Sequence, residues 1–250
     1  VESAVRASPS PMTATPTPTR NQRSRRSMLT AGGLAVAVGG GLLFAAPWPM
    51  GAGRTDASVV SVEREPAYQD RGLLALAMAL PNAAAYVRAG FASQRNASFC
   101  GPTTALNVER SLGKDDDQDH VLEGTGVRSI LGYVWGGLTL DEEAALLRQK
   151  TGRRATVLRD LDLARFRQEL ARANDPGLRY VVNFARGPLF GRGGGHHSPV
   201  GGYLPDRDLV LVLDVNASYR PWLVTTARLF EAADTYDPKT HQKRGLIRIE

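Results

Sequence analysis

The sequence predicts an α+β fold in which a helical amino half is followed by an antiparallel sheet. Between residues 59 and 113, apolar side chains such as Leu73, Leu76 and Leu80 recur at helical spacing. After residue 179, short β-prone runs alternate with glycine-rich or Pro-Asp turns. Because 250 residues suffice for one such domain plus an extension, we expect the functional domain to span residues 60–250.

The amino-terminal residues divide into two segments. Residues 1–27 are rich in proline, threonine, serine and arginine, which is typical of a disordered basic region. Within residues 28–52, an apolar run from Leu29 to Ala46 follows Arg25 and Arg26. This pattern predicts a twin-arginine-like signal that exports the protein to the periplasm or cell envelope. The run of 18 residues is also long enough for an uncleaved anchor, which would associate residues 29–46 with a membrane.

The formal net charge of +6 comes largely from this extension. Residues 1–46 contain five arginines and one glutamate, which leaves 26 basic against 24 acidic residues in the rest of the chain. The predicted domain therefore lacks the basic excess that nucleic-acid binding requires, and we expect no nucleic-acid partner.

Two further helices and four strands are predicted for the remainder of the domain. Thr139 and Glu142 form a capping-box pattern that opens a helix through Lys150, and another helix is expected at residues 161–171. The β-prone runs predict strands at residues 180–184, 199–203, 209–215 and 246–249. The helices should thus form one lobe and the sheet another.

Cys100 is the only cysteine in the sequence. The residues after it predict a helix that begins here, because Pro102 suits a first turn and Ala105, Val108 and Leu112 follow at helical spacing. Unpaired N–H groups and the positive end of the helix dipole would stabilise a thiolate at this position. Cys100 is therefore a candidate nucleophile, although a lone cysteine is also often a small buried apolar residue.

A cysteine nucleophile needs a base, and the base needs a partner that fixes its tautomer. His196 and His197 follow a glycine run, and Asp214 ends an apolar run where a buried carboxylate requires a partner. Spacing alone leaves two interpretations open: His196 pairs with Asp214, or Asp214 caps a turn while His196 lies in a loop. Gln94 precedes Cys100 by six residues and is a candidate donor to the oxyanion of a tetrahedral intermediate.

These segments together resemble the phytochelatin synthase family of papain-like thiol enzymes, in its short bacterial form. The resemblance rests on Gln94 with Phe99-Cys100-Gly101, the run Val181-Val-Asn-Phe, the segment His196-His197-Ser198-Pro199-Val-Gly-Gly-Tyr203, and Leu213-Asp214-Val215. It extends from about residue 67 to the carboxyl end. It implies a papain-like fold in which the helical lobe carries the nucleophile and the antiparallel sheet lobe carries histidine and aspartate.

The resemblance also implies roles for individual residues. Cys100 would be the nucleophile, His196 the base and Asp214 the residue that orients it, with Gln94 as oxyanion donor. His196 is preferred because the family commonly has an aromatic residue at the position of His197. The substrate-binding residues implied beside this triad are Gly101, Ser198, Tyr203 and Arg220.

The substrate that the resemblance implies is glutathione. Cys100 would attack the cysteinyl carbonyl, release glycine and hold γ-Glu-Cys as a thioester, which passes to water or to a second glutathione. Ala217 stands where the family commonly has an arginine, and the sequence shows no counterpart of the cysteine-rich region of the plant enzymes. Arg220 could replace the missing arginine only if the chain adjusts, so hydrolysis or weak transfer is the expected outcome.

No directly bound cofactor or protein-ligated metal is implied. Heavy-metal ions such as cadmium or zinc would act as thiolate complexes of glutathione, that is, as part of the substrate. A homodimer is one assembly open to the chain, and glutathione is the expected small-molecule partner.

Two other functions stay open on the sequence. A papain-like cysteine peptidase or amidase acting on another exported peptide would use the same triad, because no residue identifies the γ-glutamyl group directly. A zinc- or thiol-binding protein would use Cys100, His196 and His197. Against the zinc site, neighbouring side chains on a strand point to opposite faces.

Overall fold

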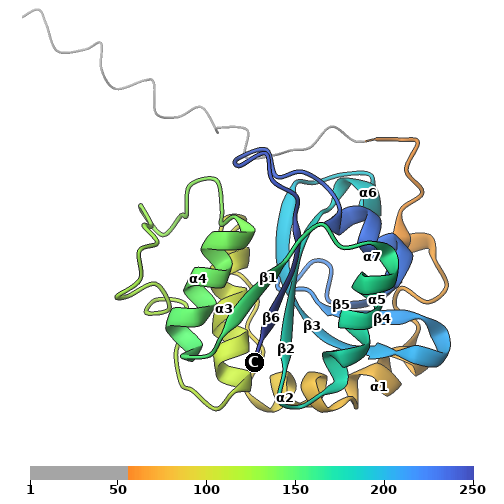
Figure 1. Cartoon of the computed structure of the whole chain (residues 1–250), viewed down its shortest axis with the longest axis horizontal. Helices are drawn as coiled ribbons and strands as arrows, with labels where there is room; N and C mark the ends of the chain where they lie inside the picture. The colour runs from red at the N-terminus through yellow and green to blue at the C-terminus, as the bar shows by residue number, and fades with distance from the viewer. Residues whose placement is uncertain (1–55) are drawn as a thin grey trace, which may run out of the picture. The chain divides into compact units, whose positions relative to one another are not determined.

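The computed structural model describes residues 56–250, in which helices cover both faces of one antiparallel sheet (Figure 1). In chain order the α-helices are α1 (Arg71–Met78), α2 (Pro81–Arg88), α3 (Cys100–Ser111), α4 (Leu140–Thr151), α5 (Leu163–Ala171), α6 (Gly187–Phe190) and α7 (Thr226–Ala233). Short 3-10 helices lie at Val62–Arg64, Arg172–Asn174 and Pro205–Arg207.

The sheet of the described residues has the strand order β1-β6-β2-β3-β4-β5, and each neighbouring pair is antiparallel. The strands are β1 (Ala155–Leu158), β2 (Arg179–Ala185), β3 (Gly195–Leu204), β4 (Leu209–Leu213), β5 (Pro221–Thr225) and β6 (Gly245–Ile249). Strand β3 lies between β2 and β4, so residues on it can meet side chains from both neighbours.

Alternating strand side chains build two hydrophobic cores, one on each face of the sheet. On one face, Val181 belongs to a core that includes Leu106 of α3. On the other face, Val182 belongs to a core with Phe166 of α5 and Leu229 of α7. Figure 1 shows α3 and α4 on the side of the sheet opposite to α5 and α7. The sheet therefore separates the helix that begins at Cys100 from the helices of the carboxyl half.

The predicted α+β architecture is confirmed, with differences in detail. Each of the four predicted strands is present, but β3 begins at Gly195, so both histidines lie within the strand and not before it. Strand β4 ends at Leu213, so Asp214 follows it. The capping box at the start of α4 is present as predicted, and α5 matches the second predicted helix.

Among the α-helices and strands of residues 56–250, four were not predicted: β1, β5, α6 and α7. The carboxyl half thus contains helices as well as the sheet, and the two lobes are less segregated than the sequence indicated. The predicted disordered region and the export signal or anchor lie outside the described residues. Within residues 56–250, no helix combines the length and apolar character needed to cross a membrane.

Candidate active site

Cys100 is the first residue of α3, and only 6% of its surface is exposed. Side-chain hydrogen bonds fix the loop before it. The side-chain carbonyl of Asn96 accepts from the backbone N–H and the hydroxyl of Ser98, and its amide donates to the carbonyl of Gly132. The first N–H groups of a helix have no intrahelical partner, so α3 directs positive partial charge toward the sulfur.

The pairing of β3 with β4 brings His196 and Asp214 together. The register sets Val200 opposite Val212, so Asp214 lies beside the part of β3 that carries His196. His196 Nε2 is 2.9 Å from Asp214 Oδ1. This contact leaves Nδ1 for the hydrogen bond between His196 and Cys100. Hydrogen bonds thus join Cys100, His196 and Asp214 as a triad. The alternative interpretation, in which His196 lies in a loop and does not pair with Asp214, does not hold.

Asp214 is buried among groups that favour its ionised form. Its carboxylate accepts from Arg186 Nη2 at 2.9 Å, from Trp222 Nε1 at 3.0 Å and from the backbone N–H of Asn216 at 2.9 Å. Burial alone would raise the pKa of Asp214, but the charges and hydrogen bonds of His196 and Arg186 outweigh it and hold the pKa below its usual range. Asp214 is therefore an anion that can orient His196.

The charges around the nucleophile favour a thiolate–imidazolium pair. Burial opposes ionisation of the thiol, but the hydrogen bond and charge of His196, with two backbone N–H groups, lower the pKa of Cys100. Burial and the charge of Arg186 oppose protonation of His196, but Asp214 and the bond to Cys100 raise its pKa overall. The pKa shifts have opposite signs, so both favour transfer of the thiol proton to the imidazole.

Gln94 lines the same cavity as Cys100. Its backbone N–H donates to the carbonyl of Val215 at 2.7 Å, which ties it to the segment that carries Asp214. Its side-chain Nε2 donates to the carbonyl of Asn96 at 2.9 Å. A primary amide has a second N–H, so Gln94 retains a donor for an oxyanion.

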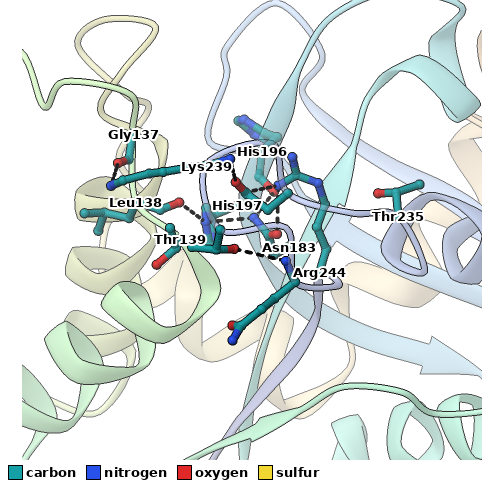
Figure 2. Close-up of polar contacts among 12 residues, drawn as sticks. Gly137, Leu138, Thr139, Asn183, His196, His197, Thr235, Lys239 and Arg244 are labelled. Carbon is teal, nitrogen blue, oxygen red and sulfur yellow. Dashed lines mark hydrogen bonds and ion pairs between the residues drawn. The ribbon is translucent and has the colours of Figure 1, made fainter.

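His197 is engaged on the other side of β3. Its Nε2 is 2.9 Å from the carbonyl oxygen of Leu138 and 2.8 Å from Asn183 Nδ2, and Figure 2 shows the ring beside both groups. Burial lowers the pKa of His197 to about 3, so the ring is neutral. Its Nε2 donates to Leu138 when it carries the proton and accepts from Asn183 when Nδ1 carries it. His197 thus links β3 to the loop before α4, whereas His196 is the partner of Asp214.

A cavity of about 430 Å³ lies over the nucleophile. Its charged lining consists of Arg186, Lys239, Arg244 and Asp237. Arg244 Nη1 donates to Asp237 Oδ2 at 2.7 Å, and Lys239 lies 2.9 Å from the carboxylate of Glu142. Figure 2 shows Lys239 and Arg244 on the two sides of His197. Three cations and one anion line the cavity, and each cation has a carboxylate partner, so a ligand with carboxylate groups would bind by exchanging with these partners.

The predicted substrate-binding residues lie outside this lining. Gly101 packs beside Leu138 behind the nucleophile. Ser198 is fully buried, and its hydroxyl accepts from the backbone N–H of Val215 at 3.4 Å. Tyr203 donates its hydroxyl to Asp208, and Arg220 is exposed on left-handed backbone with φ 57°. The structure thus places these four residues outside the cavity lining, and the substrate-binding roles implied for them stay predictions.

Several residues of the site were not predicted from the sequence. They come from β2 and the residue after it, from β5, and from the loop between α7 and β6. Of these residues, Arg186 could have been found from the sequence. Its guanidinium comes two residues after the buried run of β2, and a charge that is buried requires a partner. The unpredicted residues are Asn183, Arg186, Trp222, Asp237, Lys239 and Arg244.

Within residues 56–250, no group of three histidine, cysteine or acidic side chains is arranged to hold a metal ion. The trio considered for zinc, Cys100 with His196 and His197, is split by the sheet. His196 Nε2 faces Asp214, and His197 Nε2 faces Leu138.

A buried cysteine at a helix amino terminus, hydrogen-bonded to a histidine that is oriented by an aspartate directly after the neighbouring strand, defines a papain-like thiol enzyme. The sequence model of the phytochelatin synthase family matches residues 67–246. This match covers most of the chain, so the chain belongs to the phytochelatin synthase family.

Curated relatives include glutathione γ-glutamylcysteinyltransferase 1 of Arabidopsis thaliana, which is 40% identical over 70 residues, or 28% of this chain and 14% of that protein. The glutathione γ-glutamylcysteinyltransferase of Schizosaccharomyces pombe is 26% identical over 171 residues, or 63% of this chain and 41% of that protein. The chain therefore spans less than half the length of these relatives.

Two solved structures show a distant likeness. The peptidase domain of Streptococcus ComA, a bifunctional ABC transporter of a quorum-sensing pathway, aligns with a TM-score of 0.42 and 16% identity over 63% of this chain and 93% of that one. A C39-like peptidase from Bacillus anthracis gives a TM-score of 0.42 and 14% identity, over 65% of this chain and 94% of that one. Likeness at this level has no bearing on the activity.

Proposed function

We propose that the protein cleaves glutathione through a thioester on Cys100, releasing glycine and passing γ-Glu-Cys to water or to a second glutathione. The observation that carries the proposal is the triad Cys100–His196–Asp214, with a cavity over Cys100 that three cationic side chains line. Membership of the phytochelatin synthase family supports glutathione as the substrate.

The first half-reaction starts from the thiolate–imidazolium pair. The Cys100 sulfur attacks the cysteinyl carbonyl carbon, and the C=O electron pair moves onto the oxygen. The backbone N–H of Cys100 and the free N–H of Gln94 are the donors available to this oxyanion. When the intermediate collapses, the C–N bond breaks, and His196 gives its proton to the glycine nitrogen.

The second half-reaction regenerates the pair. His196 is now neutral and takes a proton from water, or from the amine of a second glutathione, as that group attacks the thioester carbon. Collapse breaks the C–S bond and returns Cys100 to the thiolate, while the proton stays on His196. Asp214 holds the imidazole through Nε2 in both halves, so the same nitrogen faces the sulfur throughout.

The charges of the cavity suit the ends of glutathione. At neutral pH the tripeptide carries carboxylates at both ends and an ammonium group on its glutamyl residue. Arg244 and Lys239 would bind the carboxylates in exchange for their present partners, Asp237 and Glu142, and Asp237 would then be released to accept from the ammonium group. The substrate would thus be held at its ends, with its central carbonyl left for Cys100.

We propose hydrolysis as the main outcome. Of the segment after Asp214, Asn216 and Tyr219 line the cavity. Ala217 is exposed and brings no charge, and Arg220 lies outside the lining. This segment therefore offers no guanidinium to a second glutathione, whereas water needs none.

Metal ions enter the proposal as part of the substrate. Thiolates are soft ligands that bind cadmium and zinc well, so glutathione would arrive as a metal thiolate when these ions are present. The rate would then follow the concentration of that complex and not the metal content of the protein.

The test is incubation of the full chain with glutathione, with and without cadmium, and analysis of the products by mass spectrometry. We expect glycine and γ-Glu-Cys in equal amounts from the wild type and none from Cys100→Ser. Arg220→Ala, which changes an exposed residue outside the cavity, is the matched control and should retain activity. If no product depends on Cys100, the glutathione assignment fails, and a peptidase acting on another exported peptide takes its place.

A further inference from the structure

Glu143 is a buried carboxyl group that the triad does not use. It lies in the first turns of α4 and has no exposed surface. Neither of its carboxyl oxygens has a hydrogen-bond partner within the described part of the chain, residues 56–250. Its neighbours on the helix differ, because Asp141 pairs with Arg159 and Glu142 pairs with Lys239 at exposed positions. Three consecutive acidic residues thus lie in the first turn of α4, and of these only Glu143 is enclosed with no partner from the described residues.

The carboxyl group of Glu143 packs against the first turn of α3. A Cβ built on Gly101 would lie 2.6 Å from Glu143 Oε2 and 2.8 Å from Leu138 Cδ1. Real Cβ atoms do not approach other atoms so closely, so Gly101 provides the space that the carboxyl group occupies. Gly101 directly follows Cys100, which places Glu143 immediately behind the nucleophile.

The surroundings of Glu143 oppose a negative charge. Burial raises the pKa of Glu143 well above its ordinary value, and the charge of Cys100 raises it further. The ionisable group of α3 that faces Glu143 is thus Cys100. Strands β1 and β6 also contact α4, and they contribute apolar residues such as Ala155 and Ile247 to the same core. Among residues 56–250 no cation offsets these effects on Glu143, and a buried unpaired carboxylate is strongly unfavourable.

We propose that Glu143 is a positioning residue for the nucleophile: an uncharged carboxylic acid that packs behind Gly101 and keeps its proton while Cys100 is a thiolate, so that the two groups share one negative charge. The coupling is reciprocal, since each charge disfavours the other. The uncharged acid supports the first turn of α3 without opposing thiolate formation. The proposal rests on Cys100 as the nucleophile of the proposed function, and it does not depend on glutathione as the substrate.

Infrared spectroscopy tests the protonation state directly. At neutral pH we expect the full-length wild type to show a C=O stretch of a protonated carboxyl group that Glu143→Gln lacks. Asp141→Asn, which changes an exposed acid in the same helical turn, is the matched control and should keep the band. An identical band in Glu143→Gln would overturn the proposal, because the band would then belong to another acid.

The coupling is tested in a variant that keeps Glu143. In Cys100→Ser the thiolate charge is absent, so the Glu143 band should disappear at lower pH than in the wild type. If the Glu143 band disappeared at the same pH in both proteins, Glu143 would be a structural acid with no link to the nucleophile, and the proposal would be overturned. Neither measurement uses glutathione, so a negative result here is distinguishable from failure of the proposed function.

Discussion

Asp214 and Glu143 are both buried carboxyl groups near Cys100, yet their surroundings favour opposite charge states. Asp214 accepts hydrogen bonds from Arg186 and Trp222, whereas Glu143 has no partner among residues 56–250. Burial raises the pKa of both groups, but only Asp214 has neighbouring cations that reverse the effect. The comparison shows that the partners of a carboxyl group, and not its depth, decide whether it can serve as an anion.

The largest effect is expected from Asp214→Asn, which removes the anion and keeps the shape. The rate of glycine release should fall by about a factor of a thousand, because the base loses both its orientation and its charge partner. The pKa of His196, which Asp214 raises, should fall, and the pKa of Cys100, which protonated His196 lowers, should rise. The pH range in which Cys100 is a thiolate and His196 an imidazolium should therefore become narrower at both its acidic and its alkaline limit.

Alkylation of Cys100 by iodoacetamide as a function of pH measures this range without substrate. In the wild type the reactive thiolate should persist below the ordinary pKa of a thiol, and it should be lost in acid as Cys100 takes up its proton. The same profile in Asp214→Asn would contradict the role of Asp214.

The next largest effect is expected from Arg186→Met, which removes a cationic hydrogen-bond partner of Asp214 and so makes its surroundings more like those of Glu143. Removing one partner of a buried ion pair destabilises a protein by about 3–5 kcal/mol. Because the pKa of folded Asp214 is depressed, its contribution to stability is present above the ordinary pKa of aspartate and is lost as the pH falls. Urea unfolding should therefore become less pH-dependent in acid for Arg186→Met. Equal pH dependence in both proteins would contradict the ion pair.

Gly101→Ala tests the space behind the nucleophile. The added Cβ would meet Glu143 and Leu138, and overpacking of this kind costs about 1–3 kcal/mol of the free energy of unfolding. The cost should be smaller in a Glu143→Ala background, where the carboxyl group no longer fills the space. A double-mutant cycle by urea unfolding measures the coupling, and additive effects would show that Glu143 does not occupy this space.

A smaller effect is expected from His197→Phe, which distinguishes the role of His197 from that of His196. It removes the hydrogen bond to Leu138, at a cost of about 1 kcal/mol of stability. The triad is untouched, so the pH profile of Cys100 alkylation should stay as in the wild type. His196→Phe is the contrasting variant, and it should lose the reactive thiolate at neutral pH.

The local parts of the structure could be predicted from the sequence. The helix at Cys100 follows from Pro102 and apolar spacing, and the long apolar strands follow from composition. The pairing of His196 with Asp214 remained one of two interpretations, because spacing does not fix the register between strands.

Features that depend on distant contacts could not be predicted. Strand β1 is short and pairs with β6, where Ala155 lies opposite Ile249. Arg186 and Asp214 meet only because β2, β3 and β4 are neighbours. Glu143 follows Asp141 and Glu142 in a helix start that is typically solvated, so its burial becomes apparent only when α4 packs on α3.

The most direct test of the central claim is the intact mass of the full-length protein, quenched in acid during turnover of glutathione. The proposed mechanism predicts a population that carries one γ-Glu-Cys acyl group, absent from Cys100→Ser and released from the wild type by hydroxylamine, which cleaves thioesters. Release of glycine with no acyl group on the protein, or an acyl group that also forms on Cys100→Ser, would contradict the thioester at Cys100.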